Sequence, residues 1–412
     1  MPGLTRSDCE ALDAADPLAA LSRRFAAGEA GTLYFDANSV GAMPVDAPAR
    51  VDRILEEWRN LRRRGWSSST WLDAPRRLGA KLAPLIGAAP DEVVVCDTTS
   101  INLFKALSAA LALKPGRRRI VSQVGTFPTD LYVVQGLQTL LAGLDLHLVP
   151  DGAAIEPALT DTTAVLYLSQ VDYRTARRLD IRGLTAAAHG KGILTVWDLS
   201  HGAGAVPAEL DAAAADFAVG CGYKYLCGGP GAPAYLFVAR RHQEAVRPAL
   251  AGWMGHADPF RFSTDYAPGE GPNRFLVGTP SVIANAVMEA ALDIWAKADP
   301  ALMFAKHAQL GDLLIRLARE GQGEAAIEVA SPVSPDERGG FVALRHNSGG
   351  AVVGALADAG VVASFRPPDS IRFGLSALYH RYVDIWDVMQ RLHGILSEGS
   401  WRAAKYAKAK TI

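Results

Sequence analysis

The 412-residue chain lacks most of the features that mark membrane, secreted and nucleic-acid-binding proteins. No apolar run reaches the length of a transmembrane helix, and the N-terminal stretch lacks the apolar core of a signal peptide. The formal net charge is only -1, so overall charge gives no reason to expect nucleic acid or an anionic membrane as a partner. These absences predict a cytoplasmic protein that acts on small molecules.

Cysteine is scarce, and its four positions show no metal-ligand spacing. Cys9, Cys96, Cys221 and Cys227 are scattered, which predicts reduced thiols and no metal centre. Internal repeats and low-complexity blocks are also absent. The composition, 49% hydrophobic and 21% charged, is that of an ordinary globular protein.

Short apolar runs alternate with helical segments through the middle of the chain. The expected strands cover 92–97, 119–123, 164–170, 193–198, 217–221 and 234–239, and the expected helices 100–113, 130–144 and 181–192. The strands are almost continuously apolar, which is typical of a sheet covered on both faces. The pattern predicts an α/β fold with a mainly parallel sheet, in which ligands bind beyond the carboxyl ends of the strands.

The pattern of apolar and helical segments changes after about residue 285. Helical segments at 281–298 and 302–320 are followed by the short stretches "GGFVALRH" and "SIRFGLSALY". We expect a smaller α+β domain here. The predicted division is an N-terminal arm at 1–50, a large domain at 51–285 and a small C-terminal domain at 286–412.

One lysine occupies an unusually constrained position. Lys224 follows Tyr223 and stands between the glycine-rich turns of "VGCGYKYLCGGPGAP". Upstream, Asp198 ends an apolar strand, where a carboxylate is costly unless a cation pairs with it. His201 follows three residues later. The alternatives are that Asp198 caps the glycine-rich turn and that His201 is only a hydrogen-bonded histidine.

Two other strand ends carry polar or aromatic residues. In "CDTTSINLF" the hydroxyls of Thr98 and Thr99 stand where a helix begins, which favours an anion site, although a simple helix cap at Ser100 is the alternative. In "VGTFPTDLY" Phe127 could offer a flat face to a ligand. There the alternative is a core phenylalanine, with Thr129 or Asp130 as a helix cap.

Together these residues match the needs of pyridoxal 5′-phosphate (PLP), a flat, basic, phosphorylated aldehyde. Lys224 would form the Schiff base, and Asp198 would keep the ring nitrogen protonated so that the ring accepts electrons. No lysine of the nucleotide-binding type follows the threonines, and the glycine spacing of a dinucleotide loop is absent, which disfavours ATP and NAD.

At this point the chain also resembles the kynureninases, fold-type I PLP enzymes of the class V aminotransferase group. The resemblance covers nearly the whole length and rests on eight stretches: "YFDANSVGAMP", "DTTSINLFK", "FPTDLY", "WDLSHGAGAVP", "YKYLCGGPGAP", "GWMGH", "FLVGTP" and "IRFGLSALY". It implies a fold-type I PLP-dependent transferase-like architecture and a homodimer with shared active sites.

The resemblance also implies a role for each matching residue. Lys224, Asp198 and Tyr223 would be catalytic, with Lys224 abstracting the α-proton and Tyr223 relaying protons. The cofactor-binding set would be Thr98, Thr99, Phe127, Asp130, Ser169, Asp198, His201, Tyr223 and Lys224, with Trp253 and Thr279 reaching the cofactor of the neighbouring subunit. The substrate-binding set would be Arg372 at the α-carboxylate, with Asn38, Ser39, Trp66 and Trp71.

The implied reaction is hydrolysis of L-kynurenine, or of a ring-substituted kynurenine, to an anthranilate and L-alanine by Cβ–Cγ cleavage. An aminotransferase, an epimerase or another β-cleavage enzyme is the alternative. A cysteine desulfurase is disfavoured because no cysteine follows Cys227. A binding module without activity is disfavoured because Lys224, Asp198 and Arg372 are all present.

The sequence departs from the family pattern at several positions. Cys227 stands where the family usually has asparagine, and Gly202 where serine is common. In "QVDYRTARR", Gln170, Asp172 and Ala176 replace the usual histidine, asparagine and glycine. The predicted cofactor residues are unaffected, so these changes leave open the ring substituents of the substrate.

Overall fold

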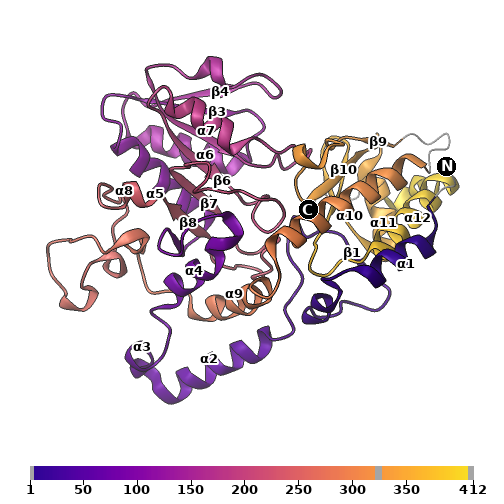
Figure 1. Ribbon diagram of the computed structural model, residues 1–412, viewed down its shortest axis with the longest axis horizontal. Coiled ribbons are helices and arrows are strands. Elements are labelled where there is room, and N and C mark those ends of the chain that lie inside the picture. The colour runs from indigo at the N-terminus through magenta and orange to yellow at the C-terminus, as the bar shows by residue number, and fades with distance from the viewer. Residues whose placement is uncertain (1–3, 321–326, 407–412) are drawn as a thin grey trace.

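The computed structural model describes residues 4–320 and 327–406 and is built around two sheets (Figure 1). The larger sheet has seven strands in the order β2-β8-β7-β6-β5-β3-β4. Their bounds are β2 Val93–Val95, β3 Arg119–Gln123, β4 Asp145–Val149, β5 Thr163–Ser169, β6 Leu194–Asp198, β7 Phe217–Gly220 and β8 Tyr235–Val238. All neighbours pair in parallel except β8, which is antiparallel to both β2 and β7. The prediction of a mainly parallel sheet is confirmed.

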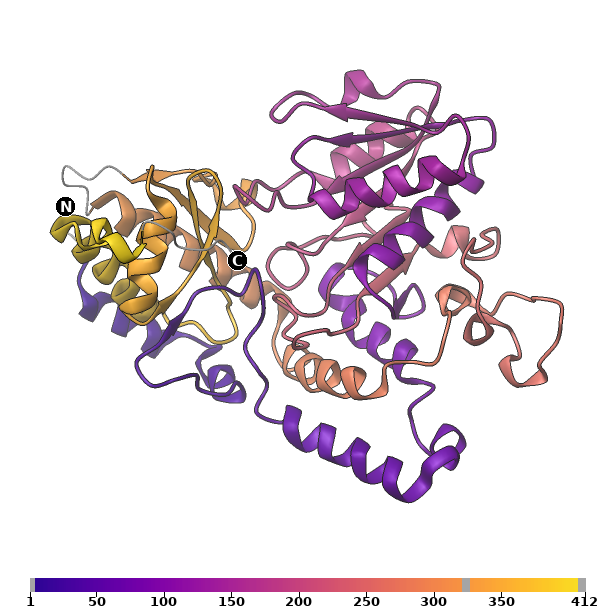
Figure 2. The ribbon, with the colours of Figure 1, turned by 180° about the vertical axis from the view of Figure 1, so that it is seen from behind.

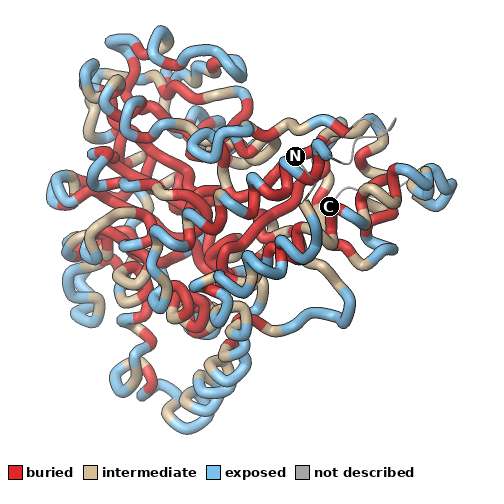
Figure 3. The backbone as a smooth tube through the Cα atoms, turned by 45° about the vertical axis from the view of Figure 1, so that its right-hand side comes forward, coloured by how far each residue is buried: buried red, intermediate tan, exposed pale blue. Residues whose placement is uncertain are grey.

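Helices cover both faces of this sheet, which explains its continuous apolar strands. Val165 and Tyr167 of β5 pack with residues of α5 (Thr99–Ala112) and α6 (Pro128–Leu140), whereas Leu166 and Leu168 pack with those of α4 (Ala74–Ile86) and α7 (Ile181–His189). Successive side chains therefore point to opposite covered faces. Figure 3 shows the buried backbone running through the middle of the molecule.

One strand and two of the longer helices of this part are absent from the sequence prediction. The predicted helix at 130–144 ends at Leu140, and Asp145–Val149 form the edge strand β4. This strand is partly exposed along most of its length, so it lacks the apolar run that marked the inner strands. Helices α2 (Ala47–Leu61) and α4 were also not predicted.

The smaller sheet is antiparallel, with the strand order β12-β13-β10-β9. Its strands are β9 Glu328–Val329, β10 Phe341–Arg345, β12 Ser364–Arg366 and β13 Ser370–Gly374. Helices α10 (Pro300–Glu320), α11 (Gly349–Asp358) and α12 (Tyr382–Glu398) pack on it (Figure 2). Helix α9 (Val282–Trp295) runs across the boundary expected at 285, and the division into three domains stays a prediction.

The N-terminal segment is attached to this smaller part by specific contacts. Helix α1 (Arg6–Ala15) packs on α12, and β1 (Leu33–Tyr34) pairs with β11 (Val361–Val362). The buried Lys306 ammonium lies 2.7 Å from Asp16 Oδ2. Asp13 accepts hydrogen bonds from the backbone N–H groups of Tyr382 and Val383, so a carboxylate from the N-terminus caps α12.

Two classes of feature are missing from the part of the chain that the structure describes. No helix there is both long and apolar enough to cross a membrane. No group of three or more His, Cys, Asp or Glu side chains there is placed to hold a metal ion. The cytoplasmic location stays a prediction.

A buried carboxylate joins three elements at the amino-terminal end of the parallel strands. Asp216 is 1% exposed and accepts hydrogen bonds from Arg241 (2.7 Å) and from the N–H of Thr195 (2.7 Å). The ring nitrogens of His189 and His242 lie 2.8 and 2.7 Å from its oxygens. Although burial opposes ionisation, these contacts hold the pKa of Asp216 well below its ordinary value.

We predict that Asp216→Asn destabilises the fold by about 3 kcal/mol at pH 7, because it removes the buried anion that several donors share. The depressed pKa means that the ionised carboxylate stabilises the fold above the unfolded-state pKa of about 4 and that this stabilisation is lost as the pH falls below it. Urea unfolding at pH 7 and pH 3 measures both effects. An equal difference between wild type and variant at the two pH values would contradict this account.

Candidate active site

Most of the predicted cofactor-binding residues gather at the carboxyl edge of the large parallel sheet. Asp198 is the last residue of β6, and it lies in register with Ser169, the last residue of β5. Lys224 lies in the loop between β7 and β8. The topology therefore brings residues that are distant in sequence to one edge, as expected for this class of sheet.

The amine of Lys224 is surrounded by three rings. Its Nζ lies 2.8 Å from His201 Nε2, 5.8 Å from the ring centre of Phe127 and 5.9 Å from that of Tyr223. Burial and the charge of Lys224 lower the pKa of His201 well below its ordinary value, so this imidazole is neutral at pH 7. A neutral imidazole can accept a hydrogen bond from the ammonium.

Close backbone packing fixes the lysine loop. The N–H of Gly41 donates to the carbonyl of Tyr223 (2.8 Å), and a Cβ at Gly41 would lie 2.3 Å from the Lys224 carbonyl oxygen. Only glycine therefore allows this approach. Cys227 adopts a left-handed φ of 59°, a conformation in which asparagine is much commoner than cysteine.

Two carboxylates are buried beside the amine. Asp198 is 5% exposed and accepts hydrogen bonds from the N–H (2.9 Å) and the hydroxyl (2.6 Å) of Ser200. Burial raises the pKa of Asp198, and burial together with the charge of Asp198 raises that of Asp130 well above its ordinary value. Because the charge of one carboxylate raises the pKa of the other, a cation placed between them stabilises their ionised forms more than a neutral group would.

Unpaired polar atoms face this cluster. Asp130 Oδ2 and His201 Nδ1 are buried and have no hydrogen-bond partner among the described residues. Buried polar atoms in native proteins are normally satisfied, so unpaired ones at a site indicate a missing ligand. A protonated, flat ring with polar substituents fits these groups, and the amine of Lys224 is placed to reach it.

The two alternatives for the strand-to-helix turns are wrong. The N-cap of α5 is Thr98, whose side chain accepts from the N–H of Ile101, and Ser100 lies inside the helix. Helix α6 begins at Pro128 with Phe127 as its N-cap and no side-chain cap, so neither Thr129 nor Asp130 caps it. Phe127 is 40% exposed, which also excludes a core position. Thr99 is the first residue of α5, and an anion could bind at this helix N-terminus.

Arg372 reaches the site from the smaller sheet. Its guanidinium is almost fully buried, and burial lowers its pKa to about 10. Nε and Nη2 donate to Ser364 Oγ (3.2 and 3.0 Å), and Nη1 donates to the carbonyl of Tyr173 (2.6 Å). With the Asn38 amide oxygen toward it, Nη2 also donates to Asn38 (3.3 Å).

These contacts engage four of the five N–H groups of Arg372. A carboxylate bound by two parallel N–H bonds must therefore displace one of the protein's own acceptors. Ser39 lies close by, with its hydroxyl donating to Asp36 Oδ1 (2.8 Å).

Sequence reasoning gave no role to Tyr173. Its ring packs edge-on against Phe127 (5.1 Å between centroids), while its carbonyl accepts from Arg372. Tyr173 thus joins the aromatic face at the amine to the arginine of the other sheet. The stretch that contains it, "QVDYRTARR", was noted only for its departures from the family pattern, and nothing in the residues themselves pointed to this position.

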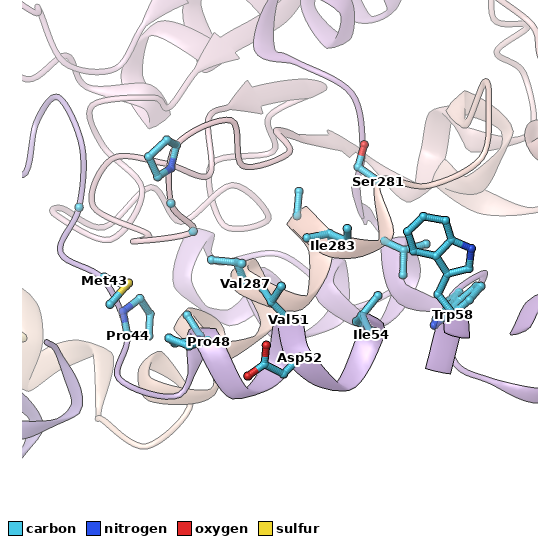
Figure 4. A pocket seen from close by; sticks show the side chains of 18 of the residues that line it. Met43, Pro44, Pro48, Val51, Asp52, Ile54, Trp58, Ser281, Ile283 and Val287 are labelled. Atoms are coloured by element: carbon cyan, nitrogen blue, oxygen red, sulfur yellow. The ribbon is translucent and has the colours of Figure 1, made fainter. Parts of the chain in front are cut away.

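Four predicted residues lie apart from this cluster within one chain. Trp66 and Trp71 line an apolar groove with a volume of about 1170 Å³ between α2 and α9, shown in Figure 4. Trp253 and Thr279 are solvent-exposed. Among the described residues, no recorded contact joins any of the four to Lys224 or Arg372.

Comparison with curated proteins gives close, full-length relatives. The chain is 45% identical over 404 residues to a kynureninase of Deinococcus radiodurans, covering 97% of this chain and 98% of that protein. It is 43% identical over 408 residues to a kynureninase of Pseudomonas fluorescens, with 98% of each chain covered. The chain belongs to the kynureninase family.

A family profile and solved structures agree with this assignment. The profile of the kynureninase C-terminal domain matches residues 303–392. The fold is similar to that of a cystine C-S lyase solved with cysteine persulfide (TM-score 0.77, 17% identity, 88% of this chain and 98% of that chain). It is also similar to a cysteine desulfurase of Escherichia coli (TM-score 0.76, 19% identity, 92% and 98%). The predicted fold-type I architecture is confirmed.

The structure couples two of this family member's departures from the usual pattern. Gln170 is fully buried, and its Nε2 donates to the carbonyl of Pro207 (2.9 Å). A Cβ at Gly202 would lie 1.9 Å from Gln170 Oε1. The longer side chain at 170 therefore occupies the space that a side chain at 202 would need.

We predict that Gly202→Ser destabilises the protein by roughly 1–3 kcal/mol, because a buried and anchored side chain must move. Gln170→Ala should remove most of that penalty in the double variant. Urea unfolding of the four proteins in a double-mutant cycle measures the coupling. Strictly additive effects would show that the two positions are independent.

Proposed function

We propose that the protein is a PLP-dependent hydrolase that converts L-kynurenine, or a ring-substituted kynurenine, to an anthranilate and L-alanine. The observation that carries this proposal is the amine of Lys224 beside the buried acids Asp130 and Asp198, in a chain related to kynureninases over its full length. The anchored guanidinium of Arg372 supplies a site for an amino acid carboxylate.

The residues present fit the cofactor. Asp198 would pair with the protonated ring nitrogen, Phe127 would stack on the ring, and His201 and Asp130 would meet its polar substituents. Ser169 lies at the end of the neighbouring strand. Thr98, Thr99 and Tyr223 would hold the phosphate at the N-terminus of α5. When bound, PLP supplies an electron sink for charge that develops on the substrate carbon atoms.

The protein's own groups carry out the remaining work. Arg372 and Asn38 bind the substrate carboxylate, which fixes the direction of the Cα–H bond. Lys224 Nζ takes the α-proton, and the neighbouring neutral His201 accepts a hydrogen bond from this amine. The Tyr223 phenol is protonated at neutral pH and can donate a proton, and burial raises its pKa further.

The atoms balance with one molecule of water. Its oxygen and one hydrogen add to the γ-carbonyl carbon, the Cβ–Cγ bond breaks, and Cβ finally takes a proton. The aromatic product is an anthranilate, and the three-carbon product is alanine. Asn38 and Ser39 would line the substrate side.

We predict that the purified protein, incubated with PLP and a panel of kynurenines, releases alanine and an anthranilate in equal amounts. Mass spectrometry measures both products. Transamination, racemisation or another β-cleavage would give different products from the same panel. If the protein binds PLP but releases no alanine from any kynurenine, the proposed reaction is wrong and only the fold and cofactor assignments remain.

Arg372 variants test the substrate assignment within the same assay. Arg372→Ala should lower kcat/KM at least about tenfold, because a charge-assisted bidentate contact is lost. Arg372→Lys should restore only part of it, since an ammonium cannot form the planar fork. PLP absorbance should be unchanged in both variants.

We further propose a homodimer with shared active sites. The groove between α2 and α9 exposes several large apolar side chains, among them Met43 (51%), Trp58 (61%) and Ile283 (44%). An exposed apolar surface of this kind is typical of an interface. We propose that a second copy of this chain covers the groove. In such a dimer, the four residues that lie apart from the site of their own chain could help to complete the site of the partner. They are Trp66, Trp71, Trp253 and Thr279.

Accordingly, Trp58→Asp and Ile283→Asp should shift the protein toward monomer, because each places a charge in an apolar contact. Sedimentation velocity measures the change. Leu140→Asp is the matched control, since Leu140 is 68% exposed on α6 and lies outside the groove. A dimer unaffected by the groove variants would place the interface elsewhere.

A further inference from the structure

A second lysine, Lys105, is completely buried beside the proposed phosphate site. It lies on α5, and its Nζ contacts Asp97 Oδ2 and donates to the carbonyl of Phe275 (2.6 Å). A buried ammonium is costly unless its donors are satisfied. Lys105 therefore links Asp97 to Phe275, which are 178 residues apart in the chain.

The first acceptor controls the start of α5. Asp97 has a left-handed φ of 49° and directly precedes Thr98, the N-cap. Its carbonyl accepts from the N–H of Ala234 (3.0 Å), so the backbone is anchored to the sheet on one side. The contact with Lys105 anchors its side chain on the other and so fixes where the first N–H groups of α5 point.

The second acceptor belongs to the segment that leads to Thr279. This segment packs against the turn that carries Trp253 so closely that the glycines of that turn have no space for a side chain. A Cβ at Gly252 would lie 2.2 Å from the Val277 carbonyl oxygen, and one at Gly255 would lie 2.4 Å from that of Leu276. Anchoring Phe275 therefore anchors both exposed residues that are proposed to reach a neighbouring subunit.

We infer that Lys105 is a positioning residue for the cofactor phosphate. It joins the phosphate turn at 97–99 to the segment at 274–279. Because Asp97 already neutralises the ammonium, Lys105 acts through the turn's geometry and not by direct contact with phosphate. The inference rests on the proposed PLP cofactor but not on the kynurenine substrate.

The test compares PLP with pyridoxal, which lacks the phosphate. Lys105→Met should weaken binding of PLP by the full-length protein at least about tenfold, because the turn loses its anchor and a buried acceptor its donor. Binding of pyridoxal should change by less than about twofold. Asp97→Asn is a milder change at a partly exposed side chain and should also weaken the binding of PLP more than that of pyridoxal. It provides the test if Lys105→Met does not fold.

Lys191→Met is a control at a solvent-exposed lysine. Lys191 also donates to a backbone carbonyl, that of Leu159 (2.6 Å), but it precedes β6 at the opposite edge of the sheet. This variant should keep the wild-type preference for PLP over pyridoxal. Equal losses for PLP and pyridoxal in Lys105→Met and Asp97→Asn, or no loss in either, would overturn the inference. A wild-type protein that binds PLP but releases no alanine would refute only the proposed reaction.

Discussion

The burial of two carboxylates at one sheet edge is the constraint on which the rest of the site depends. Asp198 ends β6 and Asp130 lies in the first turn of α6, and the two cannot both be charged cheaply without a cation. The amine of Lys224 offsets part of this cost. The remaining unpaired atoms leave the pocket complementary to a protonated ring. If PLP binds as proposed, its protonated ring would supply the missing positive charge, and the same two acids would contribute to both cofactor affinity and reactivity.

The sequence predicted the large sheet well because burial on both faces leaves a continuous apolar signature. It also singled out Asp198, which ends such a run, Phe127, which follows another, and Lys224, which stands between glycine-rich turns. Strand β4 was missed because its partly exposed edge position erases that signature. The part played by Tyr173 could not be predicted, because it depends on a contact between the loop after β5 and a strand some 200 residues later. No local pattern encodes such a contact.

The smaller sheet contributes one buried guanidinium to a candidate site built mostly by the larger one. Arg372 is held by Ser364 beside it and by the carbonyl of Tyr173 across from it. Family resemblance, not local pattern, singled out this arginine. The structure adds that its donors are nearly all committed before any substrate arrives. In the proposed role, a substrate carboxylate would bind here by an exchange of partners, which favours ligands that present two acceptor oxygens in one plane.

The contact between Gly202 and Gln170 also constrains how this protein could have diverged. With glutamine at 170, nearly every side chain at 202 meets an occupied volume. A lineage that carries this pair regains a side chain at 202 at lower cost once position 170 has become smaller. Sterics therefore favour one order of substitutions, and ancestors reconstructed one position at a time would include combinations that carry the penalty of this contact.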